Sequence, residues 1–574
     1  MIKDNVTDTG SNYKFYEGAP KANPPRSMFD VSYINTLTCH QGEVIPCYDA
    51  LTYMNEDYNY NIEAICRVVN PPVVPLMSRQ RLIFHTYWMS FHQIWKNSQI
   101  FFDKGKTTGQ AATADELVIP TIKLTHWERG SLADYLGFNV VDTTGVSEFE
   151  FPALKFVAYV KIMRDYYINQ RLHAASLENS DDSDDALIYA WMYPLDDADF
   201  RIGSPQWNAL VQSQTAVDKL FGSVWYRDFA DDYFTRCQIK PIYSDDIPEV
   251  NLSLSPDGVF VPKVKVIPSG QANQNVMGYT ESVPSGQTAR DFVGVTVNGA
   301  TGATISVPSF AERLTNSVYY QSNFISGLTI DAIRNCEAST LILEKMAKTD
   351  GSYGEFARAM FGETPKSAYD FKATLVGASY QEILFSQVLN TTSNNQGAIT
   401  GIGVSSGKGN IGKFHSDDYG YLLTMCSVMP DTYYCTGLKR EDTYQTSDDF
   451  YLPERSQLGM QAVLNKELYN DLTDVEHNDD VFGYQNRFDE MRYRANEVHG
   501  KVADLSNNSF SPYIQTRHFQ SRPTLTPEFV TTKDNISTNW LTHETEVPYI
   551  IQVAHRVTAI RPLPYRAFPA TFGM

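Results

Sequence analysis

The chain has 574 residues and a formal net charge of −20. This acidic balance argues against binding nucleic acid through the whole surface, because such affinity comes mainly from Lys and Arg that neutralise phosphates. Aromatic residues make up 13% of the chain. Together with β-branched residues they suit half-buried sheets and contact surfaces, so the composition favours a β-rich protein with much interface.

The chain contains an odd number of cysteines and no CxxC pair, which predicts free thiols rather than a disulfide framework. They are Cys39, Cys47, Cys66, Cys237, Cys336, Cys426 and Cys435. Residues 1–18 are polar and lack the apolar centre of a signal peptide. No run of about 18 apolar residues occurs, so we expect no membrane insertion.

The predicted elements begin after an N-terminal arm, residues 1–30, that is polar and has no core of its own. Alternation and β propensity predict strands at Asn61–Val69, in the first half of Arg81–Trp95, at Tyr419–Val428 and at Tyr549–Ile560. Helical spacing predicts helices at Ala153–Tyr167, Thr329–Lys348, Tyr353–Phe361 and Leu458–Tyr469.

Three segments between these elements are predicted to be loops. Residues 178–186 are acidic, residues 251–309 are rich in Gly, Ser, Thr, Val and Asn, and residues 390–412 are rich in Gly, Ser and Asn. Strands at both ends of the chain, with helices and long loops between them, indicate one β scaffold interrupted by excursions.

Two motifs within residues 403–414 resemble catalytic or nucleotide-binding patterns. Gly407–Lys413 satisfies GxGxxG, but Phe414 stands where a phosphate-binding loop needs a hydroxyl, and a strand rather than a helix is predicted to follow. Ser405 fits GxSxG inside low-complexity sequence, where a chance match is expected. We expect no catalytic residue and no enzyme activity, although ATP binding would support a nucleotide-dependent enzyme.

Candidate metal ligands are equally unspecific. Asp181, Asp182, Asp184 and Asp185 could gather oxygen ligands for Ca²⁺, but no glycine or distal glutamate stands at EF-hand spacing. His40 next to Cys39 lacks a second pair of zinc ligands. We therefore expect no metal site and no cofactor, with an ion at a subunit contact left open.

Local basic groups are the remaining candidates for chemistry. Basic side chains near aromatic ones suit single-stranded nucleic acid, while the alternative is arginine stems that cover core aromatics. The candidate single-stranded-DNA contacts are Lys408, Lys413, Arg492, Arg494, Arg556 and Arg561.

Several motifs resemble the major capsid proteins of Microviridae, in particular those of the gokushovirus-like branch. Near the N-terminus these are Ser27–Asp30, Asn35–Pro46, Pro71–Met77 and Asp232–Cys237. The late motifs are more specific. Leu458–Tyr469 is similar to "L-G-x-Q-A-V-x-N-K-E-x-Y", and Val481–Arg487 is similar to "V-F-G-Y-Q-E-R". Ser78 and Ala495-Asn496 depart from the family pattern and indicate a divergent relative.

The resemblance implies a mainly β fold, a single jelly-roll barrel over residues 31–574 with long insertions that contain helices and loops. It also implies roughly sixty copies in a T=1 icosahedral shell around the circular single-stranded DNA genome of a tailless bacteriophage. Residues 251–309 would be the variable surface insertion, a threefold protrusion.

The implied partners are the chain itself, the genome, a small basic DNA-packaging protein, a minor virion or pilot protein and a host-surface receptor. The protein would be located in the virion after assembly in the bacterial cytoplasm. The alternative is a β-sandwich carbohydrate-binding or receptor-recognition protein, which would need a concave aromatic site.

Overall fold

The computed structural model describes residues 24–104, 118–138, 148–194, 196–241, 330–349, 353–365, 371–389, 399–456, 459–504, 506 and 510–566. The chain divides into two units, Met1–Pro241 with Met346–Met574, and Ile242–Lys345. Of the second unit only residues 330–345 are described, and they form most of helix α10 (Ile330–Ala347). The predicted insertion 251–309 lies outside the described residues.

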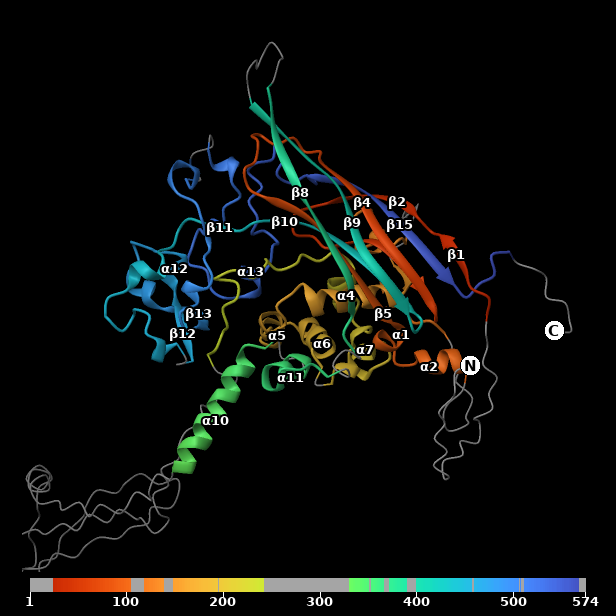
Figure 1. The fold of residues 1–574 in the computed structure, drawn as a ribbon, viewed down its shortest axis with the longest axis horizontal. Coiled ribbons are helices and arrows are strands. Elements are labelled where there is room, and N and C mark those ends of the chain that lie inside the picture. Colours follow the sequence, from red (N-terminus) through yellow and green to blue (C-terminus); the bar gives the residue numbers. More distant parts are fainter. Residues whose placement is uncertain are drawn as a thin grey trace, which may run out of the picture. The chain divides into compact units, whose positions relative to one another are not determined.

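The first unit is built on a nine-stranded antiparallel sheet (Figure 1). The strand order is β1-β15-β4-β9-β8-β5-β10-β3, and β2 also pairs with β15. The strands are β1 (Ser27–Asp30), β2 (Tyr33–Cys39), β3 (Ile45–Thr52), β4 (Glu56–Val68), β5 (Gln80–Ser90), β8 (Thr374–Leu389), β9 (Ile399–Ser416), β10 (Gly420–Pro430) and β15 (Tyr549–Arg561).

The sheet folds over at β8 and β9, because each of these strands changes partner along its length. Residues 374–383 of β8 pair with β5, whereas residues 384–389 pair with β9. From Val404 onward β9 pairs with β4. The result is a curled antiparallel half-barrel with helical insertions, which confirms the predicted mainly β, jelly-roll fold class.

Strand β10 separates two hydrophobic cores. Its side chains alternate, so that Leu422 and Cys426 face the inside of the curl while Leu423 and Met425 face outward. The inner core also takes residues from β2, β3, β4, β5 and β15. The outer core lies between β5, β10 and a layer of helices, which accounts for a strand that is buried on both faces.

Helices gather on the β5–β10 side of the sheet (Figure 1). They are α1 (Phe91–Ile94), α2 (Ser98–Asp103), α3 (Leu132–Tyr135), α4 (Leu154–Tyr166), α5 (Gln170–Glu178), α6 (Ser183–Met192), α7 (Pro205–Leu210) and α8 (Gln214–Phe221). The small sheet of β6 (Thr121–Leu124) and β7 (Phe149–Pro152) precedes α4. Helix α4 is buried along nearly its whole length and forms the centre of this layer.

A third hydrophobic cluster joins residues of the C-terminal part of the chain, such as Val463 and Phe482, to residues from earlier in the chain, such as Phe234. Its elements are β11 (Tyr433–Tyr434), β12 (Met460–Leu464), α12 (Asn465–Leu468), β13 (Val481–Asn486), β14 (Asn496–Glu497) and α13 (Pro527–Val530). The helix predicted at Leu458–Tyr469 is therefore wrong over residues 460–464. Pairing of β12 with β13 overrides the local helical preference, and the two most specific sequence motifs lie side by side.

The other predicted strands and helices are present in the structure. Strands β4, β5, β10 and β15 and helices α4, α10 and α11 (Tyr353–Phe361) occupy the predicted segments. Two boundaries change. Residues 27–30 of the predicted arm form β1 on the edge of β15, and the acidic loop 178–186 gives way to α6 at Ser183. Asp182 caps this helix, and Lys219 contacts Asp182 and Asp185 at 2.6 and 2.9 Å.

The predicted loop 390–412 is wrong for residues 399–412, which belong to β9. The glycines before the end of the predicted loop lie on its inward side at alternate positions, where β8, the end of β4 and the chain after β4 approach closely. A Cβ atom at Gly409 would stand 1.9 Å from Ser379 Oγ, and one at Gly403 would stand 2.5 Å from Val68 Cγ2. Ser405 shares this inward face and is 3% exposed, within a strand rather than the sharp turn that a nucleophile needs.

Four thiols from different strands line the inner core. Cys39, Cys47, Cys66 and Cys426 are all buried and none is in a disulfide bond. Burial raises the pKa of each of these thiols, that of Cys66 to about 12. They therefore serve as small apolar core residues rather than nucleophiles.

Candidate functional site

Strands β15, β4 and β9 each have one side toward the inner core and one side away from it. We call the side that points away from the inner core the bare face. The helical layer packs against β5 and β10 instead. Alternate residues of β15 and β4 point outward on the bare face and are exposed or partly exposed. Lys408, Lys413 and Arg556, three of the six predicted DNA contacts, lie on it together.

Glu63 on β4 lies between two of these cations. Lys408 Nζ is 2.8 Å and an Arg556 guanidinium nitrogen 3.5 Å from its carboxylate. The hydrogen bond from Lys408 lowers the pKa of Glu63. Over the outward positions of the three strands, four basic side chains (Arg67, Lys408, Lys413, Arg556) stand against two carboxylates (Asp57, Glu63). This region is therefore positive on a strongly acidic chain.

A β-bulge brings Lys413 to the bare face. The register between β4 and β9 shifts between Tyr60 and Asn61, so Ile411 is the extra residue and its side chain is buried in the inner core. Gly412, with φ +124°, supplies the backbone conformation that the bulge needs. Within the described part of the chain neither Lys413 nor Arg67 has an ion-pair partner, so both charges are available to a ligand.

Arg561 points inward and belongs to the end of the barrel. Its Nε is 3.0 Å from a carboxylate oxygen of Glu56, whose side chain is only 1% exposed. The same carboxylate accepts hydrogen bonds from the Tyr58 hydroxyl at 2.6 Å and the Tyr53 amide at 3.0 Å. This geometry gives Arg561 a structural partner, and its predicted contact with DNA is not supported by its position.

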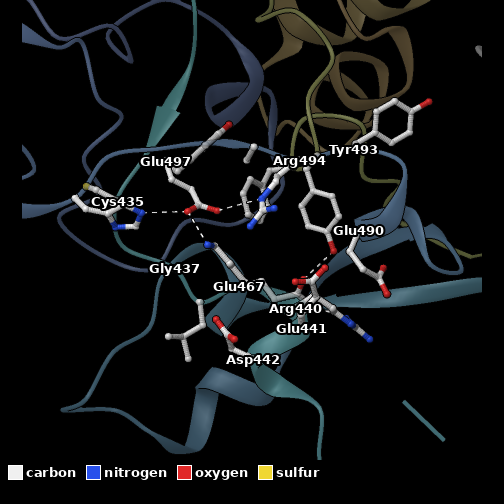
Figure 2. Close-up of a pocket in the computed structure, with 17 residues that line it drawn as sticks. Cys435, Gly437, Arg440, Glu441, Asp442, Glu467, Glu490, Tyr493, Arg494 and Glu497 are labelled. Carbon is white, nitrogen blue, oxygen red and sulfur yellow. Dashed lines mark hydrogen bonds and ion pairs between the residues drawn. The ribbon is translucent and has the colours of Figure 1, made fainter. Parts of the chain in front are cut away.

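Arg492 and Arg494 lie in the C-terminal region, away from the bare face. Arg492 pairs with Asp489, while Arg494 lines a cavity of about 330 Å³ (Figure 2). In this cavity Glu497 is contacted by Lys439 at 3.0 Å, His499 at 3.1 Å and Arg494 at 3.8 Å.

The charge of this cavity does not favour a phosphate. Five carboxylates line it, against three Lys or Arg side chains and one histidine. Glu467 at its base is buried and is already bonded by Arg440 at 2.6 Å and by the Tyr233 hydroxyl at 2.8 Å. Phosphate groups are repelled by a carboxylate majority, so the geometry supports the bare face over this cavity as a contact for DNA.

Sequence reasoning missed four polar residues of the bare face. Arg67, Asn59, Asn61 and Asn410 all point outward next to the predicted cations. The alternation within residues 61–69 would have placed Arg67 on the exposed side of its strand. The sequence did not indicate which strands would pair with the strand of Arg67. That pairing is what brings these residues together on one surface.

Comparison with known proteins settles the class of the protein. The family of phage capsid proteins described as "Capsid protein (F protein)" matches residues 19–571. The chain belongs to this capsid-protein family. Its relatives include three proteins named "Capsid protein VP1". That of Bdellovibrio phage phiMH2K is 24% identical over 98% of both chains.

The VP1 of Chlamydia phage 1 is 23% identical over 96% of this chain and 97% of its own length. That of Spiroplasma virus 4 is 21% identical over 88% and 87%. These findings confirm the predicted Microviridae family and the major capsid protein function, and they place the protein in a phage virion. Among the described residues, no helix combines the length and hydropathy needed to cross a bilayer.

Proposed function

We propose that this capsid protein assembles into a T=1 shell of roughly sixty copies that encloses a circular single-stranded DNA genome, with the bare face toward the DNA. The role is structural rather than catalytic. The observation that carries the proposal is the positive charge of the bare face, in particular Lys413 and Arg67, which have no ion-pair partner among the described residues.

The chemistry of the bare face suits a flexible strand of varied sequence. Lysine and arginine side chains contact phosphates, and the side chains of Asn59, Asn61 and Asn410 can donate to phosphate and base atoms. A few contacts per subunit are weak alone. Repeated over a closed shell they add up, because each further contact with the same strand is intramolecular.

The acidic remainder of the chain suggests the partners. A small basic DNA-packaging protein would supply the positive charge that a shell of net −20 per subunit lacks. A minor pilot protein and a host-surface receptor complete the set, with assembly in the bacterial cytoplasm. Residues 251–309 remain our proposal for the variable surface insertion and for the threefold protrusion.

Binding of the purified subunit to fluorescent oligothymidylate, measured by anisotropy at several salt concentrations, tests the bare face. We expect Lys413→Gln to weaken binding and to reduce the slope of log affinity against log salt by about 0.7, the value for one phosphate contact with a single strand. Arg67→Gln should behave in the same way. Lys533→Gln, at an exposed lysine outside the sheet, is the matched control and should leave the slope unchanged.

Electron microscopy and nuclease treatment test the shell itself. Uniform spherical particles that protect circular single-stranded DNA are expected from infected cells. Particles that protect duplex DNA, or a chain that stays monomeric in infected cells, would contradict the proposal. An unchanged salt slope in both variants would move the DNA contact away from the bare face without affecting the shell.

A further inference from the structure

The hairpin of β8 and β9 extends beyond both halves of the sheet. The pairing of β5 with β8 ends at Gln80 and Ile383, and the pairing of β4 with β9 ends at Arg67 and Val404. Residues 384–389 and 399–404 continue as a two-stranded ribbon. In the described structure only one further backbone hydrogen bond reaches the ribbon, from the Gly401 amide to Pro72 at 3.4 Å.

The two sides of this ribbon differ. On the inward side Phe385 packs against Trp540, with ring centroids 5.6 Å apart, and Gly401 and Gly403 lie close to Pro72 and Val68. The outward side is mostly apolar, with Ser386 and Thr400 among its residues, and continues onto the neighbouring strands. Its side chains are between 38% and 70% exposed, and we call them the apolar patch: Leu384, Val388, Ile402, Val404, Ile65 and Ile550.

The strand register arranges the patch in rows, with Arg67 between Val404 and Ile550. Leu384 stands opposite Val404, Val404 opposite Arg67, and Arg67 opposite Ile550, so these four side chains form one row across β8, β9, β4 and β15. Ile402 and Ile65 lie one step along the strands from this row. An apolar area of this kind, about several hundred Å² with Arg67 inside it, marks an interaction site on a subunit.

We propose that the apolar patch is a contact between neighbouring copies of this chain. The inference rests on the proposed self-assembly. A patch of this size supplies roughly half of the ~800 Å² that each partner buries in a standard interface.

Open ribbon edges point to the same conclusion. Unpaired strand edges next to an apolar surface invite uncontrolled pairing unless another chain covers them. A closed shell covers them in every subunit, because all copies present the same ribbon to equivalent neighbours.

Hydrogen exchange on the full chain tests the contact without any substitution. We expect amides of residues 384–389 and 400–404 to exchange rapidly in dissociated subunits and slowly in shells reassembled without DNA. Equal exchange in both states would overturn the inference. Protection that appears only when DNA is added would assign the patch to the genome instead.

Substitution gives a second, independent test. Leu384→Glu and Ile402→Glu should leave the melting temperature of the subunit within a few degrees of wild type, because both side chains are exposed, while shell yield falls at least about tenfold. Leu472→Glu is the matched control, since Leu472 is 82% exposed outside the sheet. Normal shells from both patch variants would overturn this inference and leave the proposed function unaffected. Failure of the wild-type chain to form shells would instead contradict the proposed function.

Discussion

At the scale of single residues, two histidines couple the fold to pH, His555 being buried and His85 partly buried. His555 Nδ1 lies 2.7 Å from the Tyr60 hydroxyl in the inner core, and His85 Nδ1 lies 2.8 Å from the Tyr167 hydroxyl beside α4. Burial lowers the pKa of each to about 4, and for His85 the nearby Arg227 adds to this effect. Both histidines are therefore neutral in the folded chain at neutral pH.

The pH dependence of stability follows from this lowered pKa. Between about pH 6.5 and 4 the unfolded chain binds protons that the folded chain does not, so the free energy of unfolding falls as the pH falls. The slope is about 1.4 kcal/mol per pH unit for each histidine. Urea unfolding at several pH values should show a smaller slope in His555→Gln. The control is His126→Gln, at a side chain 62% exposed, and an unchanged slope in His555→Gln would contradict the assignment.

The pair of Arg561 and Glu56 makes a second prediction. Arg561→Met leaves a buried carboxylate without its cation, and we expect the subunit to lose about 2–4 kcal/mol of stability, since Arg561 itself is partly exposed. Glu56→Gln in the same background should recover part of the loss. If Arg561→Met instead kept its stability and lost affinity for oligothymidylate, Arg561 would be a DNA contact after all.

At the scale of elements, β9 shows why low-complexity sequence can form a central strand. Gly409→Ala should cost about 1–3 kcal/mol, because the added methyl group would meet Ser379 on β8. Ser379→Gly in the same chain should remove most of that cost. Ser406→Ala, on the exposed side of the strand, is the control. Additive effects of Gly409→Ala and Ser379→Gly in a double-mutant cycle would contradict the close approach.

The elements that sequence patterns predicted correctly are those whose own periodicity decides their structure. Helix α4 carries apolar residues on nearly every side because it is buried, and β15 alternates strictly. β9 and β12 were missed because their structure depends on a partner strand distant in the sequence. Gly407 and Gly409 in β9 are explained by Gln381 and Ser379 on β8, and the strand conformation of β12 is explained by its pairing with β13.

The candidate DNA contacts could likewise be predicted from the sequence only in part. Lys408 and Lys413 were chosen as basic residues of a loop and Arg556 as part of a tail, and only the sheet brings them beside each other. Arg561 and Arg556 are five residues apart on one strand, so they face opposite sides of it. Composition identifies the charge, while the strand register decides which charges share a surface.

At the scale of the whole first unit, the two large cores are coupled through β10. Leu422 and Leu423 are neighbours in sequence and belong to different cores. Either substitution to alanine should cost about 2–5 kcal/mol. We expect both variants to lower the denaturant midpoint for amide exchange in α4 and in β15 together. If Leu423→Ala lowered the midpoint for amide exchange only in α4, the helical layer would unfold independently of the barrel.

The bulge at Ile411 has a consequence for how related chains can vary in length. Before it, even-numbered residues of β9 point outward, and after it odd-numbered residues do, so that Lys408 and Lys413 share a side while Phe414 stays in the core. Deleting Ile411 would remove the extra residue and leave a regular ladder in which Lys413 and His415 still point outward and Phe414 still points inward. The bulge is thus the position in β9 where one residue can be lost without a change of sidedness, and viable variants that differ by one residue in this strand should differ at the bulge.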